Sequence, residues 1–128
     1  MDSQEFIKHL NEIQVLMEQE DYKEAISLIE KLKKVEKETE FGYNLTHRLY
    51  QLDSNSRSLY NQQIILMNVR DLSKKHKIIS FQELKQILGD KKEITLTEDI
   101  LRREIELLIL RNQLPWKIEK DNIILNSS

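Results

Sequence analysis

Residues 78–125 constrain the fold more than any other part of the sequence, because their apolar pattern predicts several short elements in direct succession. Apolar residues recur at helical spacing over 81–88, between Ser80, which can cap a helix, and Gly89, which can stop one. This pattern predicts a short helix of two to three turns. Because almost no chain is left over for loops, we expect the elements of this segment to pack directly against one another.

A longer helix is predicted to follow. Thr95 or Thr97 can cap it, and Pro115 is expected to end it. Ahead of this helix, Ile94 can form a short edge strand. The residues expected to face inward from the helix are Ile100, Leu101, Ile105, Leu108 and Ile109.

After this helix the apolar residues alternate with polar ones, which predicts two antiparallel strands joined by a turn at 120–122. Trp116 and Ile118 belong to the first strand, and Ile123 and Leu125 belong to the second. The second strand is expected to be the outer one, with unpaired backbone groups that can receive a strand from a neighbouring chain. Helix, helix, small strand, helix and hairpin in this order form the winged variant of the helix-turn-helix, a scaffold for binding either DNA or protein.

Three stretches of this segment carry a resemblance to a known family: Ile79-Ser80-Phe81-x-x-Leu84-x-x-Ile87-Leu88, Glu104-Ile105-Glu106-Leu107-Leu108-Ile109-Leu110 and Leu114-Pro115-Trp116-Lys117-Ile118-Glu119. They resemble the C-terminal part of PCI domains, the module of proteasome-lid, signalosome and translation-initiation scaffolds. Winged-helix adaptors of the ESCRT-II type are almost as similar. The resemblance implies α-hairpins that run directly into a winged helix, and partners that extend a shared sheet edge to edge.

The N-terminal part of the sequence predicts an antiparallel α-hairpin. Apolar residues at helical spacing indicate a first helix over 3–18, and a second helix begins behind Asp21 and continues to about Glu38. A short third helix is expected to end at Asp53. The turn-forming residues 54–56 then precede a long fourth helix.

These patterns together predict a mainly α-helical protein. Residues 1–55 would form the α-helical hairpin region. Residues 56–128 would form a winged-helix module with a two-stranded wing, including a long linking helix that reaches about Lys77.

The charge balance gives no sign of a nucleic-acid-binding surface. Lysine and arginine number 20 against 22 aspartates and glutamates, so the formal net charge is -2. The sequence has no cysteine, no signal peptide and no apolar run long enough for a membrane span. We therefore expect a soluble intracellular protein, cytoplasmic or nuclear, without membrane insertion.

The sequence contains no constellation typical of an active site or a metal centre. His9, His47 and His76 are scattered without the spacing of metal ligands, and the two glycines cannot build a phosphate-binding loop. No nucleophile motif occurs. We expect a protein that is not an enzyme and that binds no metal or cofactor.

The first functional hypothesis is a protein-interaction adaptor or scaffold subunit. The longer helix of 78–125 is apolar on adjacent faces, so part of its apolar surface should form an exposed patch or meet the N-terminal helices. Its partners would be protein subunits, including another winged-helix protein or a second copy of the chain. The candidate interface residues are Leu107, Ile109, Leu110, Trp116 and Ile124.

The alternative hypothesis is a small winged-helix regulator that binds DNA. Arg102 and Arg103 would then contact the duplex, and Lys117 and Lys120 on the wing would contact phosphates. Acidic residues share the helix with the two arginines, and each acid would face phosphate at close range. This mixture of charges favours the adaptor hypothesis.

One basic cluster, Lys74-Lys75-His76-Lys77, stands out at the expected end of the long helix. Cations at a helix C-terminus interact favourably with the helix dipole, which accounts for the cluster as a solvated cap. The other interpretation is a contact for phosphate or for an acidic partner.

Overall fold

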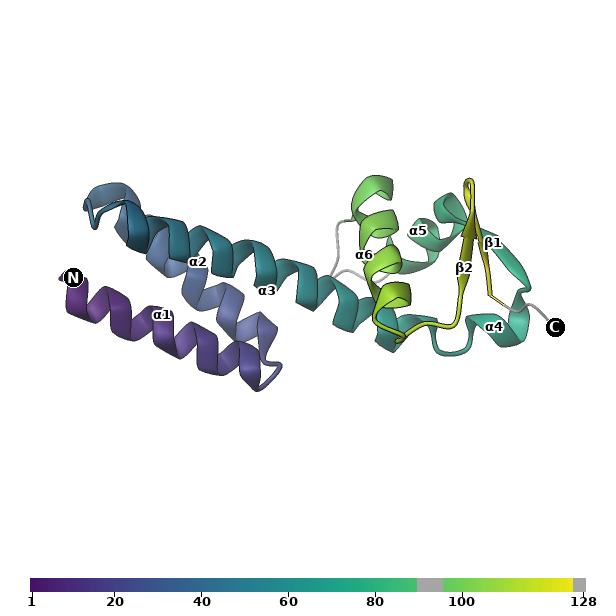
Figure 1. Cartoon of the computed structure of the whole chain (residues 1–128), viewed down its shortest axis with the longest axis horizontal. Coiled ribbons are helices and arrows are strands. Elements are labelled where there is room, and N and C mark those ends of the chain that lie inside the picture. Colours follow the sequence, from purple (N-terminus) through teal and green to yellow (C-terminus); the bar gives the residue numbers. More distant parts are fainter. Residues whose placement is uncertain (90–95, 126–128) are drawn as a thin grey trace. The chain divides into compact units, whose positions relative to one another are not determined.

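The computed structural model describes residues 1–89 and 96–125, which divide into two compact units, Met1–Tyr60 and Asn61–Ser128. The described residues are mainly helical, and a small three-stranded antiparallel sheet lies in the C-terminal unit (Figure 1). The boundary between the units falls within helix α3, Tyr43–Val69. The predicted mainly helical class is therefore confirmed.

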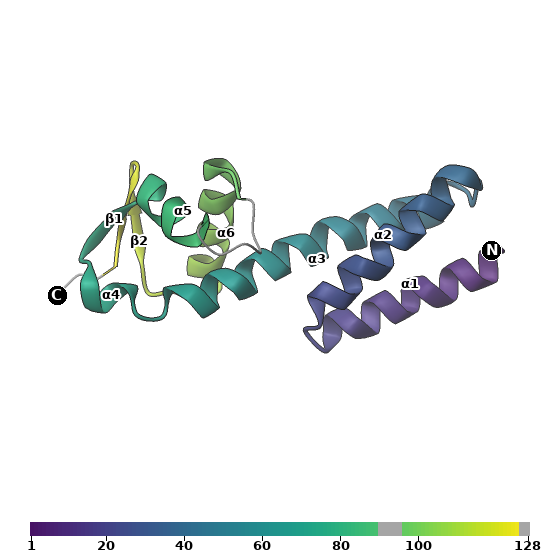
Figure 2. The ribbon, with the colours of Figure 1, turned by 180° about the vertical axis from the view of Figure 1, so that it is seen from behind.

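The N-terminal unit consists of α1 (Ser3–Glu18), α2 (Tyr22–Glu38) and the first part of α3. The three helices run in alternating directions, as Figures 1 and 2 show from opposite sides. The predicted helices over 3–18 and from Asp21 to Glu38 are confirmed. At the start of α1 the Asp2 side chain accepts a hydrogen bond from the Glu5 backbone N–H at 2.8 Å, which satisfies an otherwise unpaired donor.

The core of this unit is built from one apolar face of each helix, as the amphipathic spacing requires. Burying one such side chain contributes roughly 1.5–3 kcal/mol. The buried members are Phe6, Leu10, Ile13, Ala25, Ile29, Leu32, Leu49 and Leu52.

The predicted break at 54–56 was wrong, because α3 continues through these residues as one helix. The Ser56 side chain is buried and donates a hydrogen bond to the Asp53 carbonyl oxygen at 3.0 Å within the helix. Lys33 of α2 and Arg57 both bind the Asp53 carboxylate, at 2.6 Å and 2.8 Å. These contacts offset the weak helix propensity of serine and asparagine.

The C-terminal unit begins with the second part of α3. In the described residues it continues with three helices and three strands. These are α4 (Leu72–Lys75), β1 (Ile78–Ser80), α5 (Phe81–Gly89), α6 (Glu98–Leu110), β2 (Lys117–Glu119) and β3 (Asn122–Ile124). The predicted helix over 81–88 is confirmed as α5. Its start is a reciprocal cap in which Ser80 Oγ accepts from the Glu83 N–H at 3.0 Å and donates to Glu83 Oε1 at 3.1 Å.

Helix α6 confirms the second predicted helix and identifies its cap. Thr97 Oγ1 accepts a hydrogen bond from the Ile100 N–H at 3.2 Å. The strand expected at Ile94 and the alternative cap Thr95 lie outside the described residues. The helix ends at Leu110, well before Pro115, so proline does not end it.

The end of α6 is a left-handed turn. Asn112 has φ 59°, its N–H donates to the Ile109 carbonyl at 3.0 Å, and the Gln113 N–H donates to the Leu108 carbonyl at 2.9 Å. This is the Schellman arrangement, and asparagine is one of the few residues that adopts its left-handed position at low cost.

The sheet has the strand order β1-β3-β2, with both pairs antiparallel. The predicted hairpin is confirmed, since Ile118 of β2 lies opposite Ile123 of β3. Strand β1 was not predicted, because the long linking helix was expected to reach about Lys77 and to lead directly into the next helix. This was wrong, since α3 ends at Val69 and the separate short helix α4 precedes β1. Its pairing makes β3 the middle strand, so the prediction that β3 is an outer strand with unpaired backbone groups was wrong.

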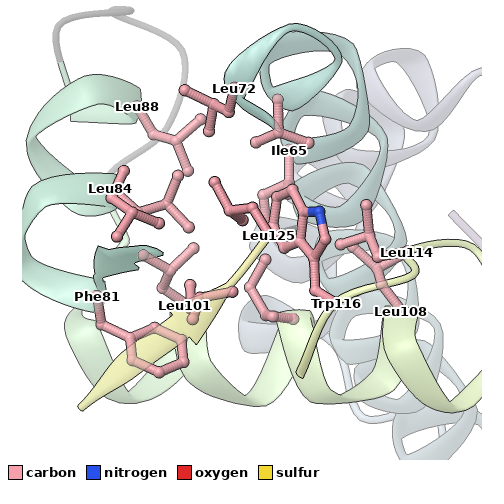
Figure 3. Close-up of a cluster of buried hydrophobic side chains, with 14 of the residues drawn as sticks. Ile65, Leu72, Phe81, Leu84, Leu88, Leu101, Leu108, Leu114, Trp116 and Leu125 are labelled. Atoms are coloured by element: carbon pink, nitrogen blue, oxygen red, sulfur yellow. The ribbon is translucent and has the colours of Figure 1, made fainter. Parts of the chain in front are cut away.

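The core of the C-terminal unit lies between α5, α6, the end of α3 and the inner face of the sheet. Figure 3 shows the Trp116 indole among leucine and isoleucine side chains from these elements. Its buried members are Ile65, Val69, Leu72, Ile79, Phe81, Leu84, Leu88, Leu96, Leu101, Ile105, Leu108, Leu114, Trp116, Ile123 and Leu125. Leu101, Ile105 and Leu108 of α6 belong to this core, whereas Leu110 at the end of the helix is 77% exposed.

Candidate functional site

The ladder between β1 and β3 determines which backbone groups face outward. Lys77 lies opposite Leu125, and the Leu125 N–H donates to the Lys77 carbonyl at 2.8 Å. Because such bonded pairs recur at every second residue of an antiparallel strand, Ile79 directs its backbone groups toward β3. Ile78 directs its N–H and carbonyl away from β3, toward the outer edge of the sheet.

The side chains follow the same alternation. Ile79 is fully packed in the core, and Ile78 on the opposite face is 58% exposed. Ile124 lies directly opposite Ile78 and is half-buried, and Lys117 of β2 lies opposite Ile124. One row across the outer face of the sheet therefore reads Ile78, Ile124, Lys117, and we call this row the outer-face row.

The basic cluster precedes this row directly. Lys74, Lys75 and Lys77 are exposed and stand at the end of α4 and in the link to β1. Lys74 pairs with Asp71 at 3.3 Å, and both side chains are largely exposed. Exposed pairs of this kind are worth only about 0.2–1 kcal/mol. Lys74 can therefore still attract an anion although it pairs with Asp71.

The five candidate interface residues occupy different environments. Leu110 is 77% exposed at the end of α6. Leu107 and Ile109 are half-buried, and Ile109 packs against the core. Trp116 is only 5% exposed, so it does not contribute to an exposed patch, because the core of the C-terminal unit needs its large apolar side chain. Ile124 belongs to the outer-face row.

Arg102, a candidate for DNA contact, is held by its own unit. Its Nη1 donates a hydrogen bond to the Lys120 carbonyl at 2.8 Å, and its Nε lies 3.3 Å from Glu106 Oε1. The guanidinium carbon also lies 5.1 Å from the centre of the Phe81 ring, which is a cation–π contact. These three contacts fix the guanidinium group against the turn of the β2–β3 hairpin.

The other three nucleic-acid candidates are more accessible. Arg103 is exposed, and its Nε lies 3.5 Å from the carboxylate of Glu104, whose side chain is fully buried. Lys117 and Lys120 are exposed on the hairpin. Glu119 is exposed on the same hairpin, so the mixture of charges inferred from the sequence extends to this surface.

Ile78 and Met67 are exposed apolar residues that the sequence argument missed. Met67 is 71% exposed on the second part of α3. For Ile78 the sequence does contain a signal, because two β-branched residues directly ahead of a capping serine favour a short strand over a helix end. Two apolar residues are too few to show a period, which is why the strand was missed.

Neither a metal centre nor a membrane span emerges from the described residues. In residues 1–89 and 96–125, no three histidine or acidic side chains gather in a way that would hold a metal ion. Over the same ranges we find no helix with the length and hydropathy that a membrane span requires. Comparison with protein-family models, with curated proteins and with solved structures found no match for this chain.

Proposed function

We propose that the chain is a non-enzymatic adaptor or scaffold subunit, acting in the cytoplasm or nucleus, whose C-terminal unit is a winged-helix docking module. The order of α5, α6 and the β2–β3 hairpin supports the winged-helix assignment, and so does the third strand contributed by β1. The PCI-like pattern of the sequence supports a role in a multiprotein complex.

The exposed pairing of Ile78 with Ile124 carries this proposal. Both side chains lie on the outer face of the sheet, and 58% of Ile78 is accessible. Completing the burial of one such aliphatic side chain contributes up to about 1.5–3 kcal/mol, which is a factor of roughly 10 to 150 in affinity. An exposed isoleucine beside an unpaired strand edge is a surface that a protein partner can cover by adding a strand.

The contacts of Arg102 argue against the alternative function of reading duplex DNA. To reach a base edge, the guanidinium group would have to leave the Lys120 carbonyl, the Glu106 carboxylate and the Phe81 ring. Glu106 is exposed beside it, where it would repel phosphate. A protein interface is the function that these charges fit better.

The test is affinity capture of the tagged full chain from its native cells, followed by mass spectrometry with quantification. We expect a partner in a fixed stoichiometric ratio, and we expect the ratio to fall at least about tenfold for Ile78→Asp. Val15→Asp is the matched control, because Val15 is 50% exposed on α1 and lies in the other unit. Capture of no stoichiometric partner would overturn the proposal, as would capture that Ile78→Asp leaves unchanged.

A further inference from the structure

We propose that the edge of β1 and the outer-face row bind an extended acidic peptide, in which an aliphatic residue lies opposite Ile78 and acidic residues follow it. This inference rests on the proposed function, because it names the class of partner that the docking module takes. Its support comes from the outward backbone groups of Ile78 and from the side chains of Ile78 and Ile124. Four lysines add to it, namely Lys74, Lys75, Lys77 and Lys117.

Among residues 1–89 and 96–125 no strand pairs with the outer edge of β1, and one residue of that edge has backbone groups available to a partner. Ile78 directs both backbone groups outward, but the Ser80 N–H already lies 3.4 Å from Glu83 Oε1 and the Ser80 side chain caps α5. The His76 N–H is bound to the Leu72 carbonyl at 2.9 Å. A partner strand can therefore exchange two hydrogen bonds with Ile78, and side chains must supply the rest of the affinity.

The outer-face row supplies the apolar contact. In an antiparallel pairing with β1, the peptide residue opposite Ile78 places its side chain on the same face as Ile78 and Ile124. An aliphatic side chain there extends the row of two isoleucines by one position and covers the exposed part of Ile78. This contact defines the aliphatic residue of the peptide.

The lysines define both the charge and the direction of the peptide. An antiparallel peptide passes Lys77 directly after it passes Ile78, and it continues toward Lys75 and Lys74. Acidic residues are therefore expected on the C-terminal side of the aliphatic residue. Lys117, at the far end of the outer-face row, adds a positive charge on the face of Ile78, whereas Lys77 alternates onto the other face.

A second copy of the chain fits this surface less well. Pairing two β1 strands antiparallel around Ile78 would place Lys77 of each copy opposite Ile79 of the other, so neither Lys77 would face an acidic residue. Opposite charges across a strand pair are stabilising, and a second β1 strand supplies none here. The charge of the surface therefore favours an acidic partner strand.

The experiment uses the full ¹⁵N-labelled chain and a blocked octapeptide in which one isoleucine is followed by three aspartates. Binding is followed by the backbone amide signals and quantified by fluorescence anisotropy of the labelled peptide. Two control peptides have asparagine in place of aspartate, or the aspartates ahead of the isoleucine. We expect saturable shifts at Ile78 and Ile124, and affinity that is at least about fivefold weaker for each control peptide.

Two protein variants test the two halves of the contact. Ile78→Ser should weaken binding about tenfold, and Lys75→Gln with Lys77→Gln should weaken it by a similar factor and flatten its salt dependence. Val15→Ser should leave it unchanged. The inference is overturned if about 1 mM peptide shifts neither Ile78 nor Ile124, if the reversed peptide binds equally well, or if Ile78→Ser has no effect.

These outcomes separate the inference from the proposed function. If capture of a stoichiometric partner depends on Ile78 but the peptide does not bind, the acidic-peptide inference alone is overturned. Saturable binding of duplex DNA at these lysines, with no peptide binding, would overturn the acidic-peptide inference in favour of a phosphate site. Absence of any Ile78-dependent partner overturns the proposed function itself.

Discussion

Arg102 Nη1 donates a hydrogen bond to the carbonyl oxygen of Lys120 at 2.8 Å and so joins α6 to the turn between β2 and β3. Lys120 occupies the left-handed region with φ 54°, which a lysine adopts at some cost. The arginine that was a candidate for reading DNA therefore holds the hairpin turn in its conformation.

Arg102→Ala should lower the free energy of unfolding by about 1–2 kcal/mol, because it removes a charge-assisted hydrogen bond and a cation–π contact. Lys85→Ala is the control, because it removes an exposed cation from α5, and it should change stability by less than about 0.5 kcal/mol. Urea denaturation followed by Trp116 fluorescence measures both. Equal effects of the two variants would show that the Lys120 contact does not stabilise the hairpin.

Asp53 should make the N-terminal unit sensitive to acid. Burial raises the pKa of its carboxyl, but the hydrogen bonds from Lys33 and Arg57 outweigh burial, and the pKa lies below its ordinary value of 3.8. A lowered pKa in the folded state gives stability that is present above the ordinary value. That stability is lost as the pH falls through the ordinary value and then through the lowered one.

The variant Asp53→Asn tests this. It should cost about 1–3 kcal/mol at pH 7, because it leaves Lys33 and Arg57 with a weaker partner, and the cost should shrink as the pH falls below about 4. Asp71→Asn is the control, since Asp71 is an exposed residue with one weak ion pair. Chemical denaturation at a series of pH values would refute the prediction if the cost of Asp53→Asn were independent of pH.

The continuity of α3 predicts the behaviour of Arg57 toward trypsin. The bond after Arg57 lies inside the helix, and its side chain is bound to Asp53 and Glu30. Cleavage there should therefore require unfolding of the N-terminal unit, and its rate should rise with urea in step with loss of helical signal. Rapid cleavage after Arg57 in the absence of urea would contradict one uninterrupted helix.

The middle position of β3 predicts that Ile124→Pro disrupts the sheet itself. Since Ile123 directs its backbone groups at β1, Ile124 directs its own at Lys117 of β2. Proline removes the Ile124 N–H, and losing this one bond should destabilise the C-terminal unit by about 1–3 kcal/mol. The urea midpoint of Ile124→Pro against Ile124→Thr, which keeps the N–H, measures this, and equal midpoints would place Ile124 on an unpaired edge.

Local signals in the sequence predicted most of the helices and the hairpin, because each depends on residues a few positions apart. The reciprocal cap of Ser80 and Glu83 is an example, with both partners within one turn. The break expected at 54–56 failed because Lys33, far away in the sequence, binds Asp53 and favours one helix. Tertiary contacts of this kind override local propensity.

The candidate site was predicted less well for the same reason. Ile124 was expected at an interface, but its neighbour Ile78 comes from a strand that exists only because β3 pairs with it. Trp116 was one of five candidates for an interface, but it belongs to the buried core of the C-terminal unit. Arg102 was a candidate for DNA contact under the alternative hypothesis, but its partner Lys120 lies 18 positions further along the sequence, across the α6–hairpin connection.

The most direct test of the docking proposal is photocrosslinking from position 78 in native cells. A photoreactive aliphatic residue in place of Ile78 retains the shape and polarity of the side chain, and the same residue in place of Val15 provides the control. We predict one dominant protein adduct from position 78 that is absent from position 15. No protein adduct from position 78, or an adduct to nucleic acid instead, would contradict it.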